Sequence, residues 1–141
     1  MTASLETRIV VLLGSACLAG FAPAASAGVR GLAAAAATVH VTVISPTHKP
    51  KVNVPWPVKV RVTNAAGKPI AATLTMQVMF EGAAVGKIDN GAVYHFVGTW
   101  QEKAGNEITW PADSRGEPLT LQFVVKAEGV TVRKNWAITV S

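Results

Sequence analysis

The stretch LTLQFVVKAEGVTVRKNWAITV, residues 119–140, decides the fold class of this chain. Apolar side chains recur at every second position in its first half, and the same period returns after the turn residues Glu128-Gly129. The residues that share the apolar face are Leu119, Leu121, Phe123, Val125, Val130, Val132, Trp136, Ile138 and Val140. A period of two is typical of a β-strand with one buried face, and glycine tolerates the backbone of a tight turn. The stretch therefore predicts an antiparallel hairpin of two long strands.

The same alternation extends back through the chain to position 38. It predicts five further strands, at residues 39–43, 56–63, 72–80, 92–100 and 107–110. A turn cluster at residues 64–69 leads us to expect a hairpin between the second and third of these strands, and Asp89-Asn90-Gly91 predicts another tight turn. No helical period occurs in residues 38–141. About seven strands in about a hundred residues predict an all-β antiparallel sandwich.

The N-terminal region predicts export through a signal peptide at residues 1–27. Arg8 supplies a positive charge, residues 9–21 form an apolar stretch, and Ala25-Ser26-Ala27 matches the small-residue pattern before a cleavage site. The apolar stretch is shorter than the about 20 residues that a membrane-spanning helix needs. We therefore expect cleavage before Gly28 and no stable membrane span in the mature chain, with an uncleaved anchor as the alternative.

Residues 28–37 are alanine-rich and too short for a stable isolated helix, so they predict a linker before a single folded domain at residues 38–141. The only cysteine, Cys17, lies inside the predicted signal peptide. The residues before it resemble a lipobox, but Gly14 stands where that pattern has an aliphatic residue. Loss of Cys17 with the signal excludes disulfide bonds, thiolate metal sites and cysteine nucleophiles from the mature domain.

Two segments resemble known domains of exported bacterial proteins. Residues 58–62 and the turn Gly67-Lys68-Pro69-Ile70, with the strand that follows, resemble bacterial immunoglobulin-like domains. The pattern Tyr94-x-Phe96-x-Gly98-x-Trp100 resembles YtkA-like sandwich domains. The resemblance covers residues 39–140 through turn and core residues, and it implies an immunoglobulin-like sandwich with a non-enzymatic role in binding, adhesion or spacing.

The positive charge of the chain does not predict a nucleic-acid partner. The formal net charge is +5 and the isoelectric point is about 9.7, but the basic residues stand singly or in pairs. A nucleic-acid surface would show a basic run interleaved with aromatic residues. The charge therefore predicts a solvated basic surface.

Metal binding is the alternative function that the sequence leaves open. The candidate ligands are His40, His48 and His95, and none of them stands at the H-x-x-x-H spacing of a sequential site. A copper or zinc site could still assemble in space from His40, His95 and Asp89. The simpler interpretation is that His48 is a solvated loop residue and His95 an outward strand residue, so we expect no cofactor.

Catalysis is not predicted. A triad of Ser114, His95 and Asp113 can be written down, but no nucleophile elbow or comparable motif surrounds it. The carboxylates after the signal peptide lie almost entirely in predicted turns, where we expect them to be solvated with ordinary pKa values.

The four tryptophans divide into two pairs. Trp56 and Trp136 share strand parity with neighbouring aliphatic residues and predict core positions. Trp100 and Trp110 stand near strand ends, where an exposed ring could stack on a sugar, although large aromatic side chains more often belong to the core.

We expect an exported binding, adhesion or spacer module in the cell envelope, with an envelope polysaccharide or another exported protein as partner. In an immunoglobulin-like sheet order, the third strand lies beside the final hairpin. Its outward residues then form a polar face suited to a polyhydroxylated or anionic polymer, although such a face also occurs without any ligand. The candidate binding residues on this face are Thr75, Gln77, Gln122, Lys126, Arg133 and Asn135, with Thr73 and Thr131 beside them.

Overall fold

The computed structural model describes residues 35–141 of the chain. The predicted signal peptide, Cys17 and most of the predicted linker lie outside the described residues. Within the described part, no helix has the length and apolar character required to cross a membrane.

The described residues form eight strands and two short 3-10 turns, with no α-helix among them. The strands are β1 (Val39–Ile44), β2 (Lys59–Asn64), β3 (Ala71–Phe80), β4 (Ala83–Lys87), β5 (Tyr94–Val97), β6 (Thr99–Gln101), β7 (Pro118–Ala127) and β8 (Val130–Thr139). The 3-10 turns are η1 (Ile88–Gly91) and η2 (Ala112–Ser114). The all-β prediction is confirmed, with one strand more than the sequence indicated.

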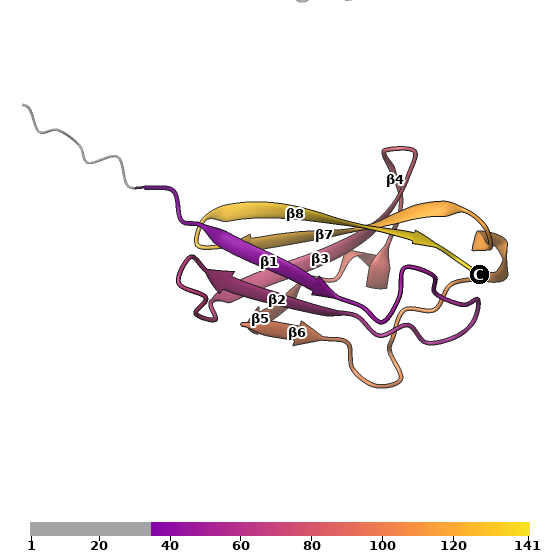
Figure 1. The fold of residues 1–141 in the computed structure, drawn as a ribbon, viewed down its shortest axis with the longest axis horizontal. Coiled ribbons are helices and arrows are strands. Elements are labelled where there is room, and N and C mark those ends of the chain that lie inside the picture. Colours follow the sequence, from indigo (N-terminus) through magenta and orange to yellow (C-terminus); the bar gives the residue numbers. More distant parts are fainter. Residues whose placement is uncertain (1–34) are drawn as a thin grey trace, which may run out of the picture. The chain divides into compact units, whose positions relative to one another are not determined.

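The strands form two antiparallel sheets (Figure 1). The smaller sheet has the order β1-β2-β6. The larger has the order β4-β3-β7-β8, and β5 pairs with β3. The first residues of β3 pair with β5 and its last residues pair with β4, so these two short strands follow one another along β3. The third strand therefore lies beside the final hairpin, as predicted.

The core contains the apolar faces that the alternation predicted. The fully buried side chains include Val58, Val60, Val62, Leu74, Leu121, Phe123 and Val125. They come from both sheets, and half-buried residues such as Val41, Phe96 and Leu119 pack against them. Sequestering these side chains from water is the main favourable contribution to folding in a domain without disulfide bonds.

The final hairpin has the predicted turn. Ala127 pairs with Val130, so Glu128 and Gly129 alone connect β7 to β8, with φ of 50° and 74°. Positive φ at both positions is typical of a type I′ turn, whose twist matches that of the paired strands. The β3–β4 hairpin is built in the same way on Glu81-Gly82, with φ of 49° and 82°, and it projects beyond the larger sheet in Figure 1.

Strand β4 escaped prediction because its five residues, AAVGK, are all exposed and show no alternation. The predicted hairpin between residues 56–63 and 72–80 is wrong, because β2 belongs to the smaller sheet and β3 to the larger. The turn itself forms as expected: the Asn64 side-chain oxygen accepts hydrogen bonds from the Ala66 and Lys68 amides, both at 3.0 Å. The chain then crosses from one sheet to the other.

Two further strand predictions need correction. Residues 92–100 do not form one strand, because β5 pairs in the larger sheet and β6 in the smaller, with the buried Gly98 between them. Residues 107–110 form no strand but only isolated bridges, Ile108 to Trp56 and Trp110 to Val52. For residues 92–100 the periodicity identified the inward residues correctly, but it did not predict their pairing partners.

Replacing Gly98 with alanine should destabilise the domain by about 1–3 kcal/mol. Gly98 has φ of 74°, and an added Cβ would lie 2.8 Å from the Pro69 Cβ atom. Gly67 is the matched control, because its φ is 76° but an added Cβ meets nothing within 4 Å. Urea unfolding of both variants separates the cost of the left-handed backbone from that of the clash. Equal losses at the two positions would contradict a steric role for Gly98.

Three of the four tryptophans occupy two different environments. Trp56 and Trp110 are 3% and 4% exposed and meet edge to face with ring centroids 6.1 Å apart, so Trp110 is not the exposed sugar platform considered above. Trp136 packs against the core but is only partly buried, and the His48 ring stacks on it at 4.1 Å. His48 is exposed as predicted, and its Nδ1 atom lies 2.6 Å from the Ala137 carbonyl oxygen.

Candidate functional site

The strand register brings the predicted binding residues onto one face of the larger sheet. Three rows of paired residues cross this face, which we call the outer face: Thr73–Lys126–Thr131, Thr75–Val124–Arg133 and Gln77–Gln122–Asn135. Paired residues in a ladder point to the same side of a sheet. The half-buried Val124 stands in the middle row, so the face is polar with an apolar centre.

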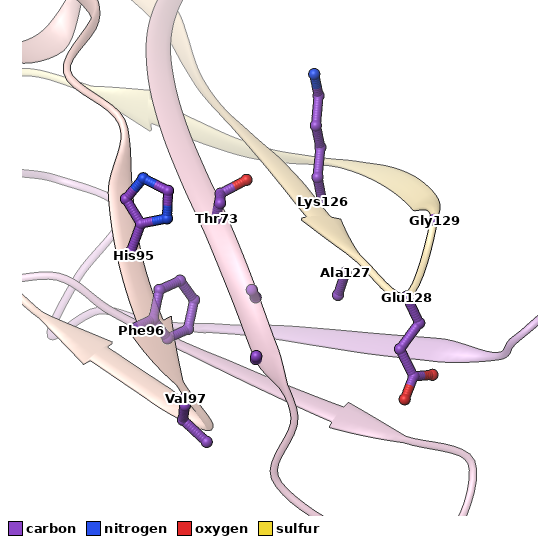
Figure 2. Close-up of a pocket in the computed structure, with 10 residues that line it drawn as sticks. Thr73, His95, Phe96, Val97, Lys126, Ala127, Glu128 and Gly129 are labelled. Atoms are coloured by element: carbon purple, nitrogen blue, oxygen red, sulfur yellow. The ribbon is translucent and has the colours of Figure 1, made fainter.

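The first row extends onto β5, because His95 pairs with Thr73. A shallow hollow of about 550 Å³ lies along this row, between β5 and the β7–β8 turn. Figure 2 shows His95, Thr73 and Lys126 side by side on three strands, with Phe96 and Val97 lining the β5 side and Glu128 extending from the turn. One end of the outer face therefore combines an imidazole, a hydroxyl and an ammonium group around an apolar floor.

The three amide side chains of the outer face bond to one another. Gln77 Nε2 donates to Gln122 Oε1 at 2.7 Å, and Gln122 Nε2 donates to Asn135 Oδ1 at 2.9 Å. Gln122, at the centre, is buried. These two bonds link β3, β7 and β8 across the outer face and leave part of the hydrogen-bonding capacity of Gln77 and Asn135 for other partners.

The outer face carries positive charge. Lys126 and Arg133 are exposed, and their charges lie two rungs apart on adjacent strands. Lys87, which the sequence did not associate with this face, pairs with Gln77 from β4 and adds a third exposed cation. The sequence could not place Lys87 on this face, because β4 lacks the alternation of apolar and polar residues by which the other strands were predicted. Together the three cations attract an extended anion through a screened long-range field.

The residues considered for metal binding and catalysis do not form a common site, although Asp89 and His95 line the same hollow. Among residues 35–141 no group of three or more histidine, cysteine, aspartate or glutamate side chains could hold a metal ion. His40 lies on β1 of the smaller sheet, whereas His95 lies on β5 of the larger. The Ser114 hydroxyl donates to the Pro111 carbonyl oxygen at 2.6 Å, and neither Ser114 nor Asp113 lines the hollows that His95 lines.

Glu102 corrects the expectation that the carboxylates are solvated. Its side chain is only 7% exposed, its Oε2 atom accepts a hydrogen bond from the Val58 amide at 3.2 Å, and its Oε1 atom has no partner among the described residues. Burial raises the pKa of Glu102 to about 7, against the lowering effect of the Val58 and Ile108 amides, and the charges of Asp89 and Glu107 raise it further. Glu102 shares parity with Trp100, so continuing the strand alternation by one step would have predicted its inward position.

Trp100 is half-buried and stands beside Glu102 at the wall of a second hollow. Part of the Trp100 ring is therefore accessible for stacking on a sugar, in contrast to the buried ring of Trp110.

Comparison with protein families and with curated proteins finds no family model and no curated protein that matches this chain.

Proposed function

We propose that the chain is an exported, non-enzymatic, immunoglobulin-like module of the cell envelope. The sheet orders β1-β2-β6 and β4-β3-β7-β8 support this proposal. With the strands lettered in chain order, these orders resemble the A-B-E and C′-C-F-G strands of an immunoglobulin-type sandwich. The difference is β5, in the place of strand D, which pairs with β3 in the larger sheet. The predicted signal peptide supports the extracytoplasmic location, and the absence of cysteine from residues 38–141 is compatible with it.

The ligand of the module is an anionic envelope polysaccharide that lies across the outer face. The observation that carries this proposal is the row His95–Thr73–Lys126, which lines the hollow of about 550 Å³ and continues across the sheet to Thr131. Hydroxyl and amide groups exchange hydrogen bonds with sugar hydroxyls, while Lys126, Arg133 and Lys87 attract carboxylate or phosphate groups. The apolar residues that line the hollow, such as Ala71 and Val97, can contact the C–H face of a sugar ring.

The double variant Lys126→Glu/Arg133→Glu should bind an anionic polysaccharide about tenfold more weakly than the unchanged protein. Reversing the two charges removes two attractions and adds two repulsions, and a tenfold loss corresponds to about 1.4 kcal/mol. Binding of the purified protein to immobilised polygalacturonate, measured at about 50 mM and about 500 mM salt, tests this expectation. Dextran, which is neutral, serves as the polymer control.

The matched control variant is Lys59→Glu/Arg61→Glu. These residues are exposed on β2, in the other sheet, and the charge change is the same. The proposal requires that this variant keep most of the binding. Equal losses in both double variants, or binding that is indifferent to salt, would remove the outer face as the site.

A further inference from the structure

A second hollow of about 350 Å³ lies on the β6 side of β5, and none of the three outer-face cations Lys126, Arg133 and Lys87 lines it. Its walls come from η1, β5, β6 and the loop after β6. The residues that line it are Asp89, Tyr94, His95, Trp100, Gln101, Glu102, Lys103 and Asn106. His95 is the single residue that it shares with the outer-face hollow.

Two aromatic rings form one wall of this hollow. The Tyr94 and Trp100 ring centroids are 4.9 Å apart, with an angle of 44° between the ring planes. Both side chains are half-buried, so the pair is held against the core and part of its surface remains accessible. The face of an aromatic ring carries partial negative charge and attracts cations.

Carboxylates surround the aromatic pair. The Tyr94 hydroxyl donates to Oδ2 of the exposed Asp89, which leaves Oδ1 of Asp89 free to accept a further donor. Glu102 lies beneath, with its Oε1 atom buried and without a partner in the described part of the chain. Burial and the neighbouring Asp89 and Glu102 raise the pKa of Tyr94 to about 12, so its hydroxyl remains a donor at neutral pH.

The charged groups that face Glu102 are mostly acidic. Asp89 and Glu107 add to the raised pKa of the Glu102 carboxyl. Lys103 is exposed at the rim, where water screens its charge. His95, on β5, is the other basic side chain that lines the hollow. A cation placed between the rings and Asp89 would offset the negative potential that opposes ionisation of Glu102, whereas a neutral ligand would not.

We propose that this hollow binds a small organic cation of the ammonium class. The Tyr94 and Trp100 rings contact the cation, the Asp89 carboxylate supplies its counter-charge, and the buried Glu102 adds a second negative charge from below. This site differs from the outer face in the charge of its ligand, and the two hollows share only His95.

Binding at this site is linked to the proton of Glu102. Near pH 6 most of the Glu102 population is protonated and near pH 8 most is ionised, because the pKa is raised to about 7. A bound cation favours the ionised form, so the protein releases a proton when it binds below pH 7. If only the ionised form binds well, the apparent affinity increases about tenfold from pH 6 to pH 8.

Calorimetric titration of the purified protein with choline tests the proposal. The neutral carbon isostere of choline, in which carbon replaces the ammonium nitrogen, separates charge recognition from simple filling of an apolar hollow. We expect choline to bind at least tenfold more tightly than the isostere at pH 8, and Asp89→Asn to weaken choline binding by about tenfold. Asp113→Asn is the matched control, because Asp113 is an exposed carboxylate in η2 that does not line the hollow.

The variant Glu102→Gln should abolish the dependence of choline affinity on pH while the protein stays folded, as checked by its thermal midpoint. A pH dependence that persists in this variant would show that another group is responsible and would overturn the role of Glu102. Equal binding of choline and its isostere, or no binding of choline at pH 8, would overturn the site itself. Polysaccharide binding at the outer face provides an independent readout, since it does not require this hollow.

Discussion

Replacing Phe123 with alanine should lower the free energy of unfolding by about 3–5 kcal/mol. Phe123 is 0% exposed and belongs to β7, which lies between β3 and β8. Truncation removes the favourable burial of the ring and leaves a cavity that the surrounding sandwich only partly fills. Because a domain of this size has only about 5–15 kcal/mol of stability, the loss should be visible as a much lower urea midpoint.

Val124→Ala is the control for this measurement, because Val124 is the next residue on the same strand and points to the outer face, where it is half-buried. Its truncation should cost about 1 kcal/mol, since fewer buried contacts are lost. A loss at Val124 as large as that at Phe123 would show that the apolar core does not lie between the two sheets. Trp136→Ala should fall between these values, because its ring is partly exposed and covered by His48.

Glu102→Gln should stabilise the domain by up to about 3 kcal/mol at pH 8 and have little effect near pH 5. The ordinary pKa of a glutamate is 4.5, and burial raises the pKa of Glu102 in the folded state to about 7. Between these two values the unfolded chain has lost the proton and the folded protein still holds it. The stability of the unchanged protein therefore falls as the pH rises through this window, and the loss is complete above pH 7.

Glutamine mimics the protonated acid, so the variant should lack this fall in stability. Denaturant unfolding at several pH values between about 5 and 8 measures the difference. Glu117→Gln is the control, because Glu117 is exposed in the loop before β7 and should leave the pH profile unchanged. If stability depended on pH in the same way in the unchanged protein and in Glu102→Gln, the pKa of Glu102 would not be raised by burial.

The two proposed sites differ in how far the sequence could identify them. The outer-face residues Gln77, Gln122 and Asn135 were predicted from parity and from the expected neighbourhood of the third strand and the final hairpin, and the register confirms that they form one row. The hollow beside Trp100 was not predicted, because Asp89 and Glu102 are far apart in the local pattern and meet only through the fold. Asp89 was considered as a turn residue and, with His40 and His95, as a candidate metal ligand, whereas the carboxylates in general, Glu102 among them, were expected to be solvated.

By itself, the sequence determined which side chains point inward and where tight turns form. The period of two at Leu121, Phe123 and Val125 follows from the geometry of a single extended strand, and the Glu128-Gly129 turn follows from residues that adopt positive φ. Neither requires knowledge of a partner. These local rules account for the all-β class and for most of the core.

Only the tertiary structure decided which strands pair. The free energy of pairing β2 with β6 rather than with β3 comes from contacts between residues distant in sequence, and several pairings satisfy the same alternation. The division of residues 92–100 at Gly98 places Trp100 in the smaller sheet. Glu102, two residues after Trp100, is then buried. The desolvation that raises the pKa of Glu102 thus arises from the packing of the two sheets, which the local pattern does not encode.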